Sequence, residues 1–269
     1  MILPDLATEF SGRVAIVTGG GSGIGRAIAL RWAAGGGTVA VLGRRTDALE
    51  HTAALAEKAG GTAETLSCDV RDAAAVDAAI DGIADRHGRL DALVNNAAGN
   101  FIVPSESLSP NGWKAVVDIV LNGSFYCTHA AARHMLPAGR GTILNTIAGY
   151  AWHGHPGTAH SAAAKGGVLA MTRSLAAEWG DRGVRVNCIA PGPTETEGAS
   201  AALWPTEQDR VRVLSSVPAD RFTTPEEVAE SAAFLLSDRA AYITGDVLVT
   251  DGGQWLGKQI YADSRAATR

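Results

Sequence analysis

A glycine-rich loop between an apolar strand and a helix constrains the fold of this chain more than any other feature. The run Val14–Thr18 is apolar and β-branched, Gly19–Gly25 (GGGSGIG) follows it directly, and a helical pattern begins near Ile24. Glycines in this context permit a tight turn and let the backbone approach a pyrophosphate at the positive end of the helix. The loop therefore predicts a dinucleotide site at the start of the chain.

Short apolar runs alternate with longer helical patterns along the rest of the sequence. We expect strands at Val14–Thr18, Thr38–Leu42, Ala63–Cys68, Ala92–Asn95, Thr142–Thr146, Arg185–Ala190 and Asp246–Val249. We expect helices to begin near Ile24, Thr46, Ala73, Pro110, Thr158 and Pro225. This alternation predicts an α/β fold of the Rossmann type, with a doubly wound parallel sheet of seven strands and helices on both faces. We expect residues 1–269 to form a single domain, with a substrate-covering insertion at about 193–218.

Composition and charge exclude several classes of partner. The chain has 23 Lys and Arg against 28 Asp and Glu, a formal net charge of −5, and no basic block of the kind that binds nucleic acid. No run of about 18 apolar residues occurs, so we expect no membrane partner and a cytoplasmic location. Cys68, Cys127 and Cys188 are far apart and are expected to be buried free thiols in a reducing compartment.

The end of the second expected strand predicts which nicotinamide cofactor binds. An NAD site places Asp or Glu there to accept a hydrogen bond from the ribose 2′-hydroxyl, but this chain has Arg44 and Arg45. Guanidinium groups bind a phosphate through charge-assisted hydrogen bonds, whereas a carboxylate would repel it. We therefore predict NADP(H). The alternative is a pair of solvated arginines at a strand end.

Motifs along nearly the whole chain have the content and order of one known family. They are Thr18–Gly25, Cys68–Val70, Asn95–Gly99, Asn122, Lys165, Pro191–Pro193, Ile243–Gly245 and Asp251–Gly253. On these residues the chain resembles the short-chain dehydrogenases/reductases. The resemblance implies that Asp69 contacts adenine and that the stretch 191–196 surrounds the nicotinamide. The predicted cofactor-binding residues are Gly19, Gly21, Ser22, Gly23, Ile24, Gly25, Arg44, Arg45, Asp69, Val70, Asn96, Ala97, Lys165, Pro191, Gly192 and Thr194.

Two hydroxyl groups of the family's ketone-reducing site are missing. The family has a serine seventeen residues before the lysine and a tyrosine four residues before it; this chain has Ala148 and Ser161 at those positions. A serine hydroxyl is too weak an acid to protonate a forming alkoxide as a lysine-tuned phenol does. The chain therefore looks like a reductase with a different use for its Lys165.

The local sequence is most similar to one subgroup, the NADPH-dependent 2,4-dienoyl-CoA reductases of the mitochondrial type. The matching segments are Asn95–Phe101, Leu108–Lys114, Asp118–Gly123, Ser174–Gly180 and Pro191–Thr194. That group has a tyrosine fifteen residues before the lysine and a serine four before it, as Tyr150 and Ser161 are here. Its active-site asparagine follows Ala-Ala-Gly, which is the position of Asn100.

The resemblance implies a reaction and a role for each residue. NADPH would deliver hydride to the far end of a conjugated diene, while Tyr150 and Asn100 donate hydrogen bonds to the thioester oxygen, where enolate charge collects. Proton uptake at the α-carbon would give a 3-enoyl-CoA. Lys165 would bind the nicotinamide ribose, Ser161 would hold Lys165, cofactor or water in place, and Asn122 would bind backbone and water within its helix.

Alternatives to these predictions remain open at the level of the sequence. Tyr150 could be an aromatic wall of the pocket, Asn100 could cap a turn, and Ser161 could lie on a helix surface. His160 could relay a proton, but the spacing of the histidines does not suggest a metal site, and we expect none. The protein could instead reduce another enone, enoyl or ketone substrate in a biosynthetic pathway, or bind NADP(H) without catalysis. A coenzyme A thioester as substrate and a homotetramer follow only from the resemblance.

Overall fold

All seven expected strands form one parallel sheet. The protein is described by a computed structural model, in which residues 5–256 are placed. The strands are β1 (Val14–Thr18), β2 (Thr38–Gly43), β3 (Thr62–Ser67), β4 (Ala92–Asn95), β5 (Gly141–Thr146), β6 (Val184–Pro191) and β7 (Val247–Thr250). They lie in the order β3-β2-β1-β4-β5-β6-β7, and every neighbouring pair is parallel. The predicted strand boundaries are confirmed to within one residue.

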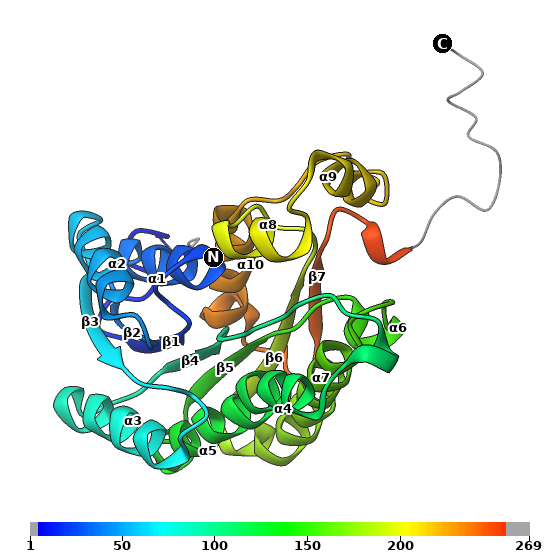
Figure 1. Ribbon diagram of the computed structural model, residues 1–269. Helices are drawn as coiled ribbons and strands as arrows, with labels where there is room; N and C mark the ends of the chain where they lie inside the picture. The colour runs from blue at the N-terminus through cyan, green and yellow to red at the C-terminus, as the bar shows by residue number, and fades with distance from the viewer. Residues whose placement is uncertain (1–4, 257–269) are drawn as a thin grey trace.

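Helices cover both faces of the sheet, as predicted (Figure 1). The helices are α1 (Gly23–Ala34), α2 (Thr46–Lys58), α3 (Ala73–His87), α4 (Pro110–Val117), α5 (Gly123–Met135), α6 (Tyr150–His153), α7 (Ala159–Trp179), α8 (Glu197–Leu203), α9 (Glu207–Leu214) and α10 (Pro225–Leu236). Helices α1, α2 and α10 pack on one face, and α3, α5 and α7 pack on the other.

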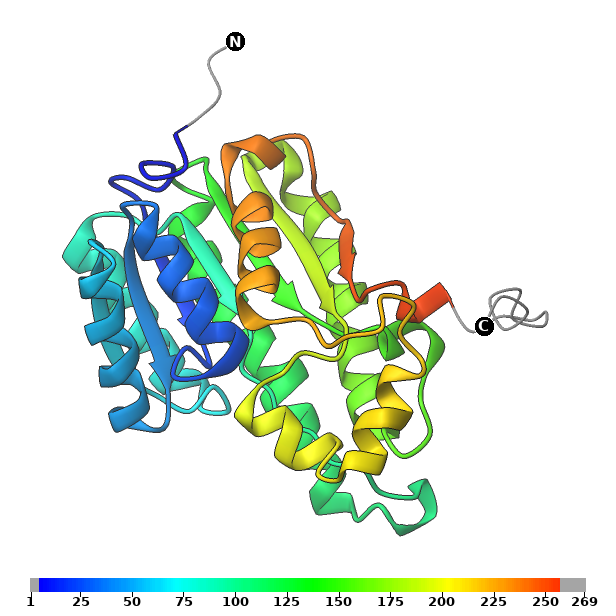
Figure 2. The ribbon, with the colours of Figure 1, turned by 90° about the horizontal axis from the view of Figure 1, so that it is seen from above.

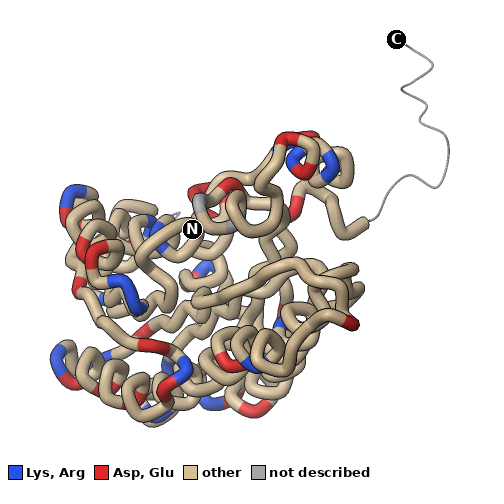
Figure 3. Tube along the Cα trace, viewed as in Figure 1, with Lys and Arg blue, Asp and Glu red and all other residues tan. Residues whose placement is uncertain are grey.

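The strands are apolar on both sides because both faces are buried. In β1, Ala15 and Val17 belong to the core under α1 and α10, while Val14 and Ile16 belong to the core under α3 and α5. All five β1 residues are buried. Charged residues of both signs lie mainly on the outer helices, and the middle of the sheet carries almost none (Figure 3). This pattern is the one expected for a doubly wound parallel sheet.

The order of the strands creates a crevice next to the glycine loop. The chain runs outward from β1 to β2 and β3, then returns to β4 on the other side of β1. Ligands of open α/β sheets bind at such a switch point, outside the carboxyl ends of the strands. The ends of β1 and β4 are tied together there, because the backbone N–H of Asn96 donates to Thr18 Oγ1 over 3.0 Å.

The region at 193–218 contains two short helices rather than one helix-like segment. Helices α8 and α9 extend beyond the carboxyl ends of the strands (Figure 2). Thr206 caps α9 by accepting a hydrogen bond from the backbone N–H of Asp209, and the Asp209 carboxylate accepts one from the backbone N–H of Thr206. The Trp204 ring lies 5.2 Å from that of Phe222, between centroids, and both are buried. Within residues 5–256, no helix is long and apolar enough to span a membrane.

Candidate active site

The glycine loop is packed so closely that larger side chains would not fit. A Cβ atom on Gly25 would lie 2.4 Å from the carbonyl oxygen of Gly19, and one on Gly20 would lie 2.8 Å from the Val41 side chain. Gly19 and Gly23 also have positive φ angles of 65° and 52°. The loop therefore needs glycine for close packing and for backbone conformation, as a pyrophosphate-binding turn does.

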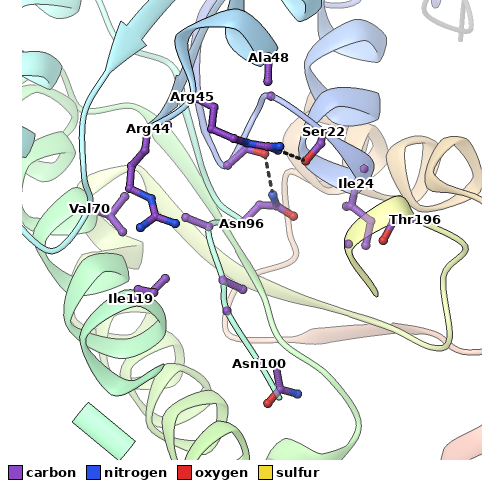
Figure 4. A pocket seen from close by; sticks show the side chains of 18 of the residues that line it. Ser22, Ile24, Arg44, Arg45, Ala48, Val70, Asn96, Asn100, Ile119 and Thr196 are labelled. Atoms are coloured by element: carbon purple, nitrogen blue, oxygen red, sulfur yellow. Dashed lines mark hydrogen bonds between the residues drawn. The ribbon is translucent and has the colours of Figure 1, made fainter. Parts of the chain in front are cut away.

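A cavity of about 510 Å³ opens beside this loop (Figure 4). Most of the predicted cofactor residues line it, namely Gly19, Gly21, Ser22, Gly23, Ile24, Arg44, Arg45, Asp69, Val70, Asn96 and Ala97. Gly25 lies beneath the loop, and Lys165, Pro191, Gly192 and Thr194 do not line this cavity. All of these cofactor assignments stay predictions, including those of the residues that line the cavity. The region at 193–218 also contributes to the cavity, through Gly198, Ala202 and Leu203. It therefore lines the space next to the glycine loop.

The rim of the cavity carries the two predicted arginines. The guanidinium of Arg45 donates to Ser22 Oγ over 3.3 Å, which holds it against the glycine loop. Figure 4 shows the Arg44 side chain reaching into the cavity towards Val70. A narrow glycine cradle next to exposed cationic groups fits a dinucleotide that carries an additional phosphate.

Arg71 is a charged neighbour of this site that the sequence analysis missed. It pairs with Asp69 over 2.6 Å, and this hydrogen-bonded ion pair holds the pKa of the Asp69 carboxyl below its usual value. The positive charge of Arg44 lowers it further. The sequence signal was available, because a residue two positions from an acidic residue in a turn is within reach of it.

Tyr150 and Asn100, the two residues predicted to bind the thioester oxygen, lie together with Ser161. Ser161 Oγ donates to the Tyr150 hydroxyl over 3.2 Å, and the Asn100 side chain lies close enough to act on the pKa of that hydroxyl. Burial raises the pKa of Tyr150 above its usual value, and the interactions with Ser161 and Asn100 oppose that shift only in part. Tyr150 is therefore a neutral phenol at physiological pH and keeps a proton to donate. The side chain of Ser161 thus contacts Tyr150, and no contact to Lys165 is seen.

Lys165 lies one turn after Ser161 on α7 and is buried. Its Nζ donates a short hydrogen bond to the backbone carbonyl of Thr146, at the carboxyl end of β5. Burial lowers the pKa of Lys165 to about 8, because the charged ammonium loses its water shell. Positions four residues apart share one face of a helix, so the spacing in the sequence correctly places these two side chains on the same side.

Asn122 is bound to its own helix. Its amide donates to the Asp118 carboxylate over 2.9 Å, within a π-helical turn (Asp118–Asn122) that separates α4 from α5. The neighbouring Val120 is the residue of this turn that packs in the core with Ala164 and Val168 of α7. The sequence predicts a bond to backbone and water, whereas the observed partner is the Asp118 side chain. Among residues 5–256, no hydrogen bond links Asn122 to Tyr150, Ser161 or Asn100, and its part in the site stays a prediction.

The nicotinamide-side residues form a tightly packed corner after β6. Thr194 is buried and its hydroxyl donates to the carbonyl of Gly192 over 3.0 Å. A Cβ atom on Gly192 would lie 2.6 Å from the Cα of Asp251, so this position requires glycine. Thr196 lines the cavity and lies next to Gly23. The corner therefore connects the end of β6 to the glycine loop.

Three arginines in or after the insertion are paired with acidic residues. Arg210 pairs with Glu195 over 2.6 Å, and Arg221 pairs with Glu227 over 2.6 Å. Arg212 lies 3.5 Å from Asp209. These pairs agree with a solvated helix face and leave no guanidinium dedicated to a coenzyme phosphate. Among residues 5–256, no cluster of three or more potential metal ligands is present.

Comparisons with known proteins agree with this geometry. The model of the family described as enoyl-(acyl carrier protein) reductase matches residues 19–254. A probable 2,4-dienoyl-CoA reductase of Bacillus subtilis, named as (2E)-enoyl-CoA-producing, is 51% identical over 91% of this chain and 97% of its own. A probable 2,4-dienoyl-CoA reductase of Caenorhabditis elegans, named as (3E)-enoyl-CoA-producing, is 42% identical over 90% of this chain and 80% of its own.

A solved structure from Beutenbergia cavernae that contains bound NADP is similar throughout. It is 36% identical and has a TM-score of 0.88, covering 93% of this chain and 99% of its own. The fold, the glycine loop and the comparisons lead to one conclusion. The chain belongs to the short-chain dehydrogenase/reductase family, a family of oxidoreductases whose fold binds a nicotinamide cofactor.

Proposed function

We propose that the protein is an NADPH-dependent reductase of conjugated 2,4-dienoyl-CoA thioesters. The observation that supports this most directly is the cluster of Tyr150, Ser161 and Asn100. It places two hydrogen-bond donors together in a site that lacks the family's ketone-reducing tyrosine. The names of the two relatives favour the same substrate class.

The geometry suits stabilisation of an oxyanion. When bound, the reduced cofactor supplies a hydride. As the far end of the diene receives it, negative charge collects on the thioester oxygen, away from the carbon that is reduced. Tyr150 and Asn100 would both donate to that oxygen. Ser161 donates to the Tyr150 hydroxyl oxygen, which leaves the phenolic proton free to point at the substrate.

The electrostatics support NADPH as the reductant. Arg44 and Arg45 lie at the rim of the cavity and would bind the 2′-phosphate. Lys165 would hold the nicotinamide ribose, and a bound cofactor would favour its charged form. The presence of NADP in a structure 36% identical to this chain supports the same choice.

The position of the remaining double bond depends on where the dienolate takes its proton. Protonation at the α-carbon gives a 3-enoyl product, and protonation at the γ-carbon gives a 2-enoyl product. The two relatives carry names with different products. We propose α-protonation and a 3-enoyl-CoA product for this protein. Gas chromatography of the acids released by hydrolysis would distinguish the 3-enoyl from the 2-enoyl product.

The proposal is tested by following NADPH and diene absorbance with a 2,4-dienoyl-CoA, for the wild type and for Tyr150→Phe. We expect stoichiometric loss of both chromophores in the wild type. Removing one oxyanion donor should lower kcat by about 10²-fold, with NADPH affinity changed less than about twofold. Tyr242→Phe is the matched control, because the Tyr242 ring is fully exposed. Absence of turnover with dienoyl-CoA, or full activity of Tyr150→Phe, contradicts the proposal.

A further inference from the structure

The segment that carries Asn100 has no regular structure. Its first residues, Asn96 and Ala97, are hydrogen-bonded to Thr18, and residues 101–103 contact Gly157 and His160. No helix or strand covers residues 96–104. The backbone N–H of Val103 donates to the carbonyl of Gly157 over 3.1 Å, and Ile102 packs so closely on Gly157 that a Cβ there would lie 2.8 Å from it. The third contact joins Phe101 to His160, whose ring centroids are 4.4 Å apart. One of two proposed oxyanion donors therefore depends on a loop whose residues 101–103 are anchored at the start of α7.

His160 is the anchor with the most unusual environment. Its side chain is completely buried, and neither ring nitrogen has a hydrogen-bond partner among the described residues. Leaving a buried polar group without a partner costs about 1–3 kcal/mol. The imidazole packs instead on the Phe101 ring, at an interplanar angle of 36°. His160 is adjacent in sequence to Ser161, and Phe101 is adjacent to Asn100, so this ring contact joins the two segments that meet at Tyr150.

We propose that His160 is a positioning residue for Asn100: its neutral ring holds Phe101, and with it the Asn100 amide, beside Tyr150, and protonation of the ring releases that hold. This inference deepens the proposed function and rests on it wherever activity is the readout. Asn100 Oδ1 already accepts a hydrogen bond from the N–H of Phe101 over 2.9 Å. A displacement of Phe101 is therefore passed directly to the Asn100 side chain.

The surroundings of His160 do not favour an imidazolium. Burial lowers the pKa of His160, and a contact with the backbone of Phe101 opposes this only in part. The titratable groups on α4, on the π-helical turn, on α6 and on the stretch from α6 to Lys165 in α7 are Lys114, Asp118, Tyr150, His153, His155 and Lys165. Asp118 is the one acid among them, and it is already paired with Lys114. A proton on His160 would thus be a buried charge with no counter-ion, which favours movement of the ring into water.

Two substitutions distinguish the role of the ring contact with Phe101 from the role of the imidazole nitrogens. His160→Phe keeps an aromatic ring of similar size but cannot titrate, whereas His160→Ala removes the ring contact. At pH 7.5 we expect His160→Ala to lower kcat at least 10-fold with NADPH affinity within about twofold of wild type, because positioning of one oxyanion donor is lost. We expect His160→Phe to stay within about threefold of wild type. The wild-type rate should fall on the acid side of pH 6.5, and His160→Phe should lack that fall.

Hydrogen exchange gives a readout that does not depend on turnover. The Phe101 N–H donates to the Asn100 side chain, and the Val103 N–H donates to the carbonyl of Gly157. Both should exchange at least 10-fold faster in His160→Ala at pH 7.5 and keep wild-type protection in His160→Phe.

The possible outcomes are distinct. Equal losses of rate and protection in both variants would mean that an imidazole nitrogen is needed and would overturn the inference, as would unchanged protection in His160→Ala. If wild type reduces no dienoyl-CoA, the proposed function fails, and exchange alone decides the role of His160.

Discussion

Replacing Lys165 with methionine should stabilise the protein without cofactor while damaging its site. Lys165 is buried, and burial lowers its pKa from 10.5 to about 8. Each pKa unit corresponds to about 1.4 kcal/mol of preference between the two protonation states, so the buried charge costs about 3 kcal/mol of folding free energy at pH 7. Loss of the hydrogen bond to the Thr146 carbonyl offsets about 1 kcal/mol. We therefore expect Lys165→Met to raise the free energy of unfolding by about 2 kcal/mol at pH 7.

The gain should disappear in alkaline solution. The unfolded chain keeps the lysine proton up to the usual pKa of 10.5, whereas the folded protein releases it near pH 8. Between these values the unfolded state binds more protons, so the wild type gains stability as the pH rises. Below pH 8 both states are charged and the full cost of the buried ammonium applies. The advantage of Lys165→Met should thus be largest below pH 8 and shrink as the pH rises to about 10.5.

Urea unfolding of wild type and Lys165→Met at pH 7 and pH 10, without NADPH and at one protein concentration, measures this difference. Lys114→Met is the control, because the Lys114 side chain is 72% exposed and pairs with Asp118 on the surface. That variant should change stability by less than about 1 kcal/mol. The reasoning is refuted if Lys165→Met is no more stable than wild type at pH 7, or if its advantage is the same at both pH values.

Two further predictions concern the cofactor and the acyl chain. Arg44→Ala combined with Arg45→Ala should weaken NADPH binding about 10- to 100-fold and NADH binding less than about threefold, because charge-assisted hydrogen bonds to a phosphate are lost. Fluorescence titration measures the affinity for each cofactor. Equal losses of NADPH and NADH affinity would contradict the assignment of the two arginines to the 2′-phosphate. Trp152 is 37% exposed, packs edge-to-face on Trp255 and lies on the same helix as Tyr150. Trp152→Ala should lower kcat/KM for a ten-carbon dienoyl-CoA about 10-fold more than for a six-carbon one, since each buried methylene is worth about 0.8 kcal/mol; equal losses would show that the acyl tail does not reach this ring.

The strands and the nucleotide loop could be predicted because their signals are local. Parallel strands such as Val14–Thr18 are buried on both sides and are continuously apolar, so composition alone marks them. The glycines of the loop are close together in the sequence and can be recognised by their spacing, although some contacts that require them come from distant residues such as Val41 and Thr196. The helix expected from Pro110 was more difficult. A π-helical turn at Asp118–Asn122 divides it, and helical periodicity does not distinguish such a turn from a regular α-helix.

The proposed catalytic cluster of Tyr150, Ser161 and Asn100 could be predicted only through spacing seen in a known family. Asn100 and Tyr150 are fifty residues apart, and no local pattern places an amide at the end of one loop beside a phenol on another. The burial of His160 is also a tertiary property, because its partner Phe101 comes from a segment without regular structure. The two helices at 193–218 had a usable signal in the capping pair Thr206 and Asp209, which marks the start of α9.

Burial shifts the pKa values of Tyr150 and Lys165 in opposite directions. It raises the pKa of Tyr150 and lowers that of Lys165, so both groups shift towards their neutral forms. The neighbours that oppose the shift of Tyr150 are Ser161 and Asn100, and Lys165 is not among them. Lys165 therefore does not acidify the Tyr150 phenol, as reduction of a carbonyl carbon would require. The raised pKa supports the proposed role of Tyr150 as a hydrogen-bond donor that keeps its proton, which suits a reaction in which charge collects on a distant oxygen.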